Sequence, residues 1–213
     1  MRAKNELLNS IPAAGEEFDV IVAGAGPAGL GAAASAAKMG ARTLLLESRG
    51  FPGGVCAIAP WMPLNRLFLD GHSRGIHQEF ADALAAFGPS AAIPGRKTWV
   101  DGDNLNIHPE YLKLAVCEVL EDLECKYCFH SPVSGVIKEG NLVKGVRIRG
   151  KRGDISWPCR VVVDATGDAD VAFFAGAEIV SGREEDGIKM FVSLCFSIAN
   201  CDVEKFFKAY PEG

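Results

Sequence analysis

The stretch FDVIVAGAGPAGLGAAASAAKMGARTLLLE, residues 18–47, decides the fold of this 213-residue chain. It opens with the apolar run Phe18–Ala23, whose β-branched residues are typical of a buried parallel strand. A glycine-rich turn of the G-x-G-x-x-G type follows, and the small residues over 30–38 predict a helix. A second apolar run, Thr43–Leu46, ends at Glu47. The order of strand, turn, helix and strand predicts a complete β-α-β unit.

The turn carries the residues that a dinucleotide needs. Gly24 permits the tight turn, Gly26 lets a pyrophosphate approach the backbone, and Gly29 lets the helix pack closely against the sheet. The N–H groups of the first helical turn then face the phosphates. Glu47 stands where a carboxylate accepts hydrogen bonds from the hydroxyls of a ribose. The unit predicts dinucleotide binding, in preference to an ordinary β-α-β turn with an incidental acid.

Composition is that of an ordinary soluble protein, with 48% hydrophobic and 23% charged residues. A net charge of -5 argues against nucleic acid as a partner. The sequence holds no apolar run long and charge-free enough to span a bilayer, so we expect no membrane contact. The first residues lack the apolar core of a signal peptide, which predicts a cytoplasmic location.

Seven cysteines are scattered through apolar segments, and an odd count favours reduced thiols over a disulfide framework. Cys125-Lys126-Tyr127-Cys128, with His130 nearby, is the one candidate for a metal or redox site. Residues three apart on a strand point to opposite faces, and no second cysteine pair completes a zinc set. We therefore predict partly buried thiols and no metal.

The rest of the chain alternates predicted helices, loops and short strands. Residues 57–69 contain two prolines, which predicts an irregular packed segment. An amphipathic helix is predicted over 73–87, a loop that covers a site over 89–106, and a second helix from Pro109 to Leu123. Strands are predicted over 125–129, 133–138, 142–149, 155–159, 160–164 and 190–198, the second and third of these forming a hairpin.

A second ligand-facing turn is predicted at Ala165-Thr166-Gly167-Asp168. It follows a continuous apolar strand and precedes an alanine-rich helix over 169–176. A further glycine-rich loop, which includes Gly53 and Gly54, comes shortly after Glu47 and suggests a backbone that passes close to a flat ligand.

Together these features resemble the FAD-dependent oxidoreductases whose flavin domain is of the glutathione-reductase type. The resemblance is to the subfamily marked by Glu47, the Gly53-Gly54 loop, the Pro-Glu-x-x-Lys helix at 109–113 and the Ala-Thr-Gly-Asp turn at 165–168, and it covers about 18–201. It implies an α/β fold: a Rossmann-like FAD-binding domain with a parallel central sheet and a small β-meander. FAD would lie across the carboxyl ends of that sheet.

The resemblance also implies which residues hold the cofactor. The glycine turn would hold the pyrophosphate, Glu47 the adenosine ribose, and the Gly53-Gly54 loop the ribityl and flavin side. Backbone near Val133 would meet the adenine. The predicted cofactor-binding residues are Gly24, Gly26, Pro27, Ala28, Gly29, Glu47, Ser48, Gly53, Gly54, Val133, Ala165, Thr166, Gly167 and Asp168.

The same resemblance predicts a division of the chain and an unfinished substrate domain. In that family a further Gly-Asp turn completes the flavin site, and no such turn follows Asp168. We therefore expect the amino-terminal part of a flavoenzyme, which self-association or a partner chain would complete. The predicted segments are a leader arm (1–17), the first part of the FAD domain (18–72), a helical and loop insertion near the substrate site (73–107), the second part of the FAD domain (108–176) and the start of a truncated substrate domain (177–213).

Three functions remain open at this point. The first is an FAD-dependent oxidoreductase that moves hydride or electrons between FAD and a small molecule. The second is an NAD(P)-binding Rossmann domain, and the third a non-catalytic FAD- or nucleotide-binding subunit. The sequence identifies no catalytic residue. His72 and Arg74 lie where a substrate anion could meet the flavin, but they could equally be polar surface residues at the start of a helix. His108 is better explained as a helix-start residue than as a base, and Cys56 has no redox partner in the sequence.

Overall fold

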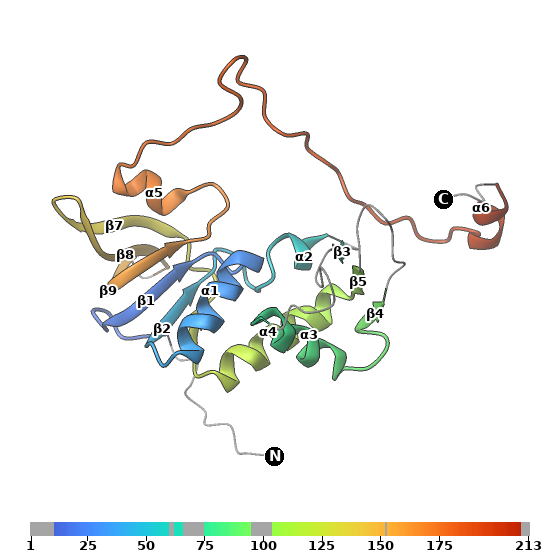
Figure 1. Ribbon diagram of the computed structural model, residues 1–213, viewed down its shortest axis with the longest axis horizontal. Helices are drawn as coiled ribbons and strands as arrows, with labels where there is room; N and C mark the ends of the chain where they lie inside the picture. Colours follow the sequence, from blue (N-terminus) through green and yellow to red (C-terminus); the bar gives the residue numbers. More distant parts are fainter. Residues whose placement is uncertain (1–10, 60–61, 66–74, 95–103, 152, 210–213) are drawn as a thin grey trace.

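The computed structural model describes residues 11–59, 62–65, 75–94, 104–151 and 153–209 of the chain. Its centre is a six-stranded mixed sheet of strand order β6-β2-β1-β9-β8-β7 (Figure 1). The structure confirms the α/β class, the parallel centre of the sheet and the β-meander that were predicted from the sequence. The strands are β1 (Phe18–Ala23), β2 (Thr43–Leu46), β6 (Lys126–Cys128), β7 (Val133–Glu139), β8 (Leu142–Gly150) and β9 (Gly153–Asp164).

The register of the central strands decides where a ligand can lie. β1 runs parallel to both β2 and β9, and Ala23 at the end of β1 is paired with Leu46 and with Asp164. The three strands therefore end at the same edge of the sheet. In open α/β sheets, ligands bind outside the carboxyl ends of the strands, and the predicted turns all start at this edge.

Most of the helices pack against the sheet or against one another, whereas the last, Val203–Ala209, lies away from the sheet (Figure 1). A second, three-stranded sheet lies beside the packed helices. The helices are α1 (Pro27–Lys38), α2 (Val55–Ile58), α3 (His77–Ala85), α4 (Pro109–Asp122), α5 (Asp170–Ala175) and α6 (Val203–Ala209). The second sheet has the order β3-β5-β4, from β3 (Met62–Asn65), β4 (Ala92–Pro94) and β5 (Asn104–Ile107).

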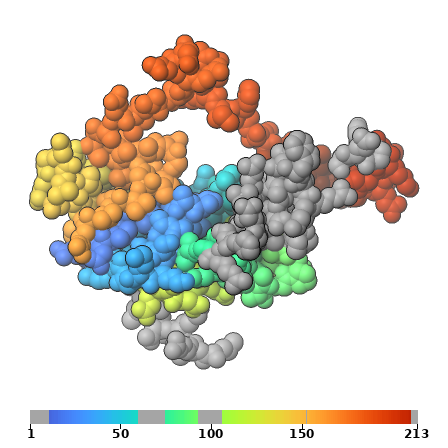
Figure 2. Space-filling model, viewed as in Figure 1, coloured from blue at the N-terminus to red at the C-terminus, as the bar shows by residue number. Residues whose placement is uncertain are grey.

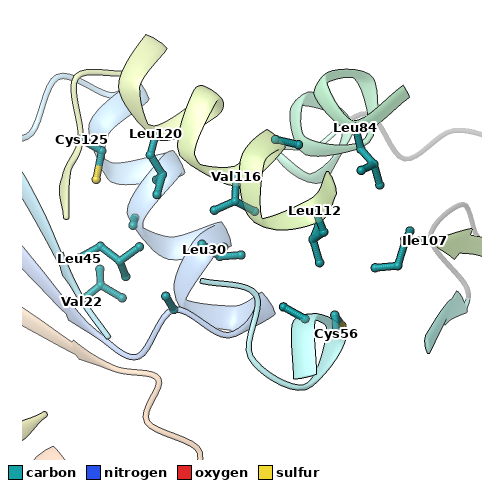
Figure 3. Packing of buried hydrophobic residues seen from close by; sticks show 14 of the residues in the cluster. Val22, Leu30, Leu45, Cys56, Leu84, Ile107, Leu112, Val116, Leu120 and Cys125 are labelled. Carbon is teal, nitrogen blue, oxygen red and sulfur yellow. The ribbon is translucent and has the colours of Figure 1, made fainter. Parts of the chain in front are cut away.

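Two buried clusters hold these layers together. On one face of the sheet, Val22 and Leu45 pack with Leu30 of α1 and with Val116 and Leu120 of α4 (Figure 3). On the other face, the second cluster is built around Trp157, which is completely buried. The indole Nε1 donates a hydrogen bond of 3.0 Å to the carbonyl oxygen of Ala13, so the segment before β1 is docked against the meander.

One long strand replaces two predicted ones. The sequence predicted separate strands over 155–159 and 160–164, whereas β9 continues through both. Its first half is antiparallel to β8, with Pro158 opposite Gly145, and its second half is parallel to β1, with Cys159 opposite Phe18. Pro158 lies at the junction, yet no turn forms there, and β9 changes its pairing partner from β8 to β1. The predicted hairpin of β7 and β8 is confirmed.

Two predicted irregular segments contain strands. Residues 89–106 were expected to form a loop, yet the described part of this range includes β4 and most of β5. The stretch 57–69, expected to be irregular, includes β3. β3 pairs with β5, a segment about 40 residues away along the chain, and local turn residues and prolines do not reveal such a partner.

The predicted strand over 190–198 is absent, and this prediction was wrong. Beyond α5 the described chain to residue 202 has no strand, and it runs away from the sheet (Figures 1 and 2). Phe191 and Val192 are 97% and 98% exposed. An alternating apolar pattern marks a face that can be buried, but a strand also needs a hydrogen-bonded neighbour, and the described residues provide none here.

Candidate functional site

One cavity of about 690 Å³ lies at the carboxyl edge of the central sheet. Three loops line it, one each after β1, β2 and β9, together with the start of β7. Its volume falls in the range of about 300–1,000 Å³ that is usual for ligand and cofactor sites. The predicted site residues that line it are Gly24, Gly26, Pro27, Ala28, Glu47, Ser48, Gly54, Val133, Ala165, Thr166, Gly167 and Asp168.

Two predicted residues, Gly29 and Gly53, lie behind this cavity and shape it. A Cβ on Gly29 would lie 1.8 Å from the carbonyl oxygen of Gly24, so only glycine lets α1 pack under the turn. Gly53 has a φ of +109° and donates its N–H to the carbonyl oxygen of Ala25 at 2.8 Å. Gly29 thus lets α1 pack against the glycine turn, and Gly53 joins that turn to the loop after β2. Contact of any of the fourteen predicted residues with a cofactor stays a prediction.

Gly26 faces open space inside the site. Its backbone is extended, with φ of -74° and ψ of 177°, and a Cβ there would have no protein atom within 4 Å. It is the N-cap residue of α1, whose amino-terminal end has no side-chain cap and no acid in its first turn. Backbone N–H groups and the positive end of the helix dipole are thus available to an anion, which fits a pyrophosphate.

Glu47 does more than the sequence predicted. Its carboxylate is buried, and Oε2 accepts a hydrogen bond of 2.7 Å from the N–H of Ala25. Oε1 accepts from the N–H of Arg49 at 2.8 Å and from the hydroxyl of Ser48 at 3.0 Å. The side chain therefore joins the glycine turn to the loop after β2. Carboxylate oxygens have further lone pairs, so these contacts leave acceptor capacity for a ribose.

Asp164, the last residue of β9, organises the third loop, and sequence reasoning missed it. Its Oδ1 accepts from the backbone N–H of Thr166 at 3.1 Å and from the hydroxyl of that residue at 2.7 Å. Its Oδ2 accepts from the N–H of Ala172 at 2.9 Å, which ties α5 to the strand. The threonine oxygen in turn accepts from the N–H of Asp170. An acid just before an Ala-Thr-Gly-Asp turn is the signal that could have indicated this role.

The same contacts change the acidity of Asp164. Partial burial opposes its ionisation, but the hydrogen bonds from Ala172 and Thr166 outweigh that effect and lower its pKa. A carboxyl group whose pKa is lowered by folding stabilises the fold above its unfolded pKa of about 3.9. That contribution is lost as the pH falls through the lower, folded pKa.

We expect Asp164→Asn to destabilise the fold by about 1–3 kcal/mol at neutral pH, because its amide would face the N–H of Ala172, a donor against a donor. The stability difference from the parent should shrink as the pH falls from about 4 toward the lower, folded pKa of Asp164, because the unfolded parent chain binds the proton first. Urea unfolding from pH 3 to pH 7 measures this difference. Exposed Asp168→Asn is the matched control, and a pH-independent difference for Asp164→Asn would contradict the assignment.

The Pro-Glu-x-x-Lys residues at the start of α4 contact the loop after β2 from outside the cavity. Lys113 forms an ion pair of 2.6 Å with Glu110, and its Nζ lies 4.1 Å from the centre of the Phe51 ring. This cation–π contact holds the loop just before Gly53 against α4.

Several lining residues of the cavity were not predicted. Arg49 supplies a cationic side chain, which suits a phosphate, but a lone arginine after a strand is too common to be a signal in the sequence. Ser131 was missed because its N–H bonds to the carbonyl oxygen of Glu47, a contact across 84 positions. The others are Leu46, Val55, Ile58, Pro132 and Asp170.

The structure provides little evidence for a catalytic role of the candidate residues. His72 and Arg74 lie outside the described residues. His108 is the N-cap of α4 and accepts a hydrogen bond from the N–H of Glu110, as a helix-start residue does. Cys56 is buried beside the cavity, and burial raises the pKa of its thiol.

The Cys-x-x-Cys pair has the environment of inert thiols. Burial raises the pKa of Cys125 to about 12 and that of Cys128 to about 11. Over the residues that the structure describes, no group of three histidine, cysteine or acidic side chains could hold a metal ion. In the same part of the chain, no helix is long and apolar enough to cross a membrane.

Comparison with known proteins places these features among flavoproteins. The model of the family described as "FAD dependent oxidoreductase" matches residues 19–212. Digeranylgeranylglycerophospholipid reductase of Picrophilus torridus is 30% identical over 158 residues, which cover 70% of this chain and 39% of that protein. The enzyme of the same name from Thermoplasma volcanium is 29% identical over 203 residues, covering 89% and 48%.

A solved structure gives the same picture of the fold. A geranylgeranyl bacteriochlorophyll reductase-like protein from Thermoplasma acidophilum superposes with a TM-score of 0.56 at 23% identity, covering 78% of this chain and 44% of that one. The chain thus spans about half, or less, of the length of the relatives that it matches.

Proposed function

Because the chain belongs to the family of FAD dependent oxidoreductases, we propose that it binds FAD in the 690 Å³ cavity and serves hydride or electron transfer between the flavin and a small molecule. The observation that carries this proposal is the convergence of three loops on one cavity, with the open side of Gly26 facing it. When bound, FAD supplies the redox chemistry, which no protein side chain supplies by itself.

The residues of this chain fit the parts of a dinucleotide. The uncapped N-terminus of α1 and the bare backbone at Gly26 suit the pyrophosphate. Glu47 would accept from the adenosine ribose while it holds the glycine turn, and the backbone near Val133 would meet the adenine. Asp164 would keep the Thr166-Gly167-Asp168 turn in place over the middle of the cofactor. The protein therefore contributes position, exclusion of water and electrostatics.

The division of the chain and its partners belong to the same proposal. The FAD domain would comprise residues 18–72 and 108–176, with a leader at 1–17, an insertion at 73–107 and the start of a substrate domain at 177–213. The exposed apolar side chains over 190–198 support completion of that domain by further chain, by self-association or by a partner. Unpaired cysteines among the described residues support a cytoplasmic location.

We expect the purified protein to bind FAD at least about tenfold more tightly than NAD, a difference of roughly 1.4 kcal/mol. The physical reason is that the Gly53-Gly54 loop and the Thr166-Gly167-Asp168 turn add walls that a simple Rossmann unit lacks. Separate titrations with FAD and NAD, followed by fluorescence and calorimetry, measure both affinities. Tighter binding of NAD would favour the NAD(P)-domain alternative, and binding of neither would favour the non-catalytic one.

A further inference from the structure

A second, smaller cavity of about 160 Å³ lies on the other side of the Gly53 loop from the FAD site. Side chains of α1, α2, α3 and α4 converge on it, and Figure 3 shows Leu30, Leu84, Leu112, Val116 and Cys56 directed toward the same region. The remaining lining residues are Pro27, Gly31, Gly53, Ile76, His77, Phe80 and Ala81.

The wall of this cavity is almost entirely hydrocarbon. Among the described residues that line it there is no carboxylate, lysine or arginine, and the polar side chains are those of Cys56 and His77. An apolar cavity of about 150 Å³ stays dry and binds a molecule the size of benzene. The chemistry and the volume therefore suit a hydrocarbon group of about six to eight carbon atoms.

The position of this cavity connects it with the FAD site. Pro27 lines both cavities, while Gly53 lines the apolar one and Gly54 the larger one. Along α2, Cys56 faces the apolar cavity, whereas Val55 and Ile58 line the larger cavity. A single backbone layer separates the two spaces, so a ligand in the smaller cavity would lie next to the bound dinucleotide.

We propose that this apolar cavity binds the hydrocarbon end of the substrate, an alkyl segment of about six to eight carbons. The proposal rests on the proposed function, because it treats the ligand as the molecule that reacts at the flavin. The helices bring the apolar faces of α3 and α4 together, and two small residues from different helices, Gly31 of α1 and Ala81 of α3, line the space.

The first test uses a series of straight-chain alcohols on the full chain: n-butanol, n-hexanol, n-octanol and n-decanol. Each buried methylene strengthens binding roughly fourfold, so affinity should rise about sixteenfold per step until the cavity is full. From n-octanol to n-decanol the gain should vanish. Ligand-dependent thermal shifts and calorimetry measure the affinities, and a continuous rise through n-decanol would contradict a site of this size.

The second test fills the cavity from its walls. A Cβ on Gly31 would lie 4.0 Å from its nearest neighbour, Cγ2 of Ile76, so a methyl group can be added there without a clash. Gly31→Leu should weaken n-hexanol binding at least about tenfold, while the matched control Gly31→Ala should stay within about fourfold of the parent. Ala81→Leu fills the same space from α3 and replaces Gly31→Leu in this test, with the same expected loss of n-hexanol binding, if Gly31→Leu does not fold.

FAD titration of the same variants separates the two proposals. Neither Gly31 nor Ala81 lines the FAD cavity, so FAD affinity should remain that of the parent. Failure of n-hexanol to bind the parent, or equal binding to the parent and to the folded filled variants, would overturn the hydrocarbon site with FAD binding intact. Loss of FAD binding by the parent, with alcohol binding retained, would instead overturn the proposed function and the assignment of the ligand as its substrate.

Discussion

Gly26→Val is expected to abolish FAD binding while it leaves the fold intact. The backbone at Gly26 is extended, a conformation that valine adopts readily, and no protein atom lies within 4 Å of the position of its Cβ. The branched side chain would enter the cavity at the helix N-terminus, where the pyrophosphate is proposed to lie. Affinity for FAD should fall on the order of a hundredfold or more, and thermal unfolding without FAD should match the parent.

Two further glycine variants make this result specific. Gly135→Val is the matched control: it lies in β7, and a Cβ there has only the far end of the Arg147 side chain nearby, at 3.8 Å. Gly29→Ala should instead lose both stability and FAD binding, since its Cβ would overlap the carbonyl oxygen of Gly24. If Gly26→Val bound FAD like the parent, the pyrophosphate would not lie there. If it unfolded like Gly29→Ala, the position of Gly26 would not be open.

The β-α-β unit could be predicted because its determinants are local. Each glycine of the turn has a steric reason that the spacing already implies, and the structure shows the close contact at Gly29 and the open space at Gly26. The apolar faces of α3 and α4 were equally readable, since a 3.6-residue period needs no knowledge of the partner. Leu84, Leu112 and Val116 lie in the core as that period predicts.

Other features depend on contacts that no local pattern records. The role of Asp164 requires that α5 turn back over the end of β9, so that the N–H of Ala172 meets its carboxylate. The contact of Glu47 with Ala25 joins residues 22 positions apart. The apolar cavity has small residues from two different helices, Gly31 of α1 and Ala81 of α3, in its lining. Each depends on how elements meet in space, which the sequence of one element does not specify.

The strand prediction over 190–198 failed for the opposite reason: the local pattern was present, but the neighbouring strand was not found among the described residues. There the local pattern was clear, since apolar residues alternate with smaller or polar ones, but a strand exists only as part of a hydrogen-bonded ladder. The described residues include no neighbour for it, so the apolar side chains are exposed. The alternating pattern alone therefore did not suffice to form a strand, and burial of this apolar face by another structural element stays a prediction.

Glu47→Gln is expected to weaken the fold and FAD binding together. The carboxylate accepts hydrogen bonds from the N–H groups of Ala25 and Arg49 through different oxygens. Glutamine has one carbonyl oxygen, so its amide nitrogen must face one of these donors in a buried place. Unfolding free energy without FAD should fall by about 1.5–3 kcal/mol, the usual cost of one hydrogen bond to a charged group. FAD affinity should also fall, on the order of tenfold or more, through the lost ribose contact.

This double loss distinguishes Glu47 from Gly26, whose substitution removes binding alone. Urea unfolding of the FAD-free protein and FAD titration, measured on both variants, separate the structural effect from the ligand effect. Exposed Glu17→Gln removes the same charge without these contacts and should match the parent in both measurements. Parental stability in Glu47→Gln would contradict the tie between the two loops. Parental FAD affinity would contradict the ribose contact, because the carboxylate would then serve only to hold the glycine turn against the loop after β2.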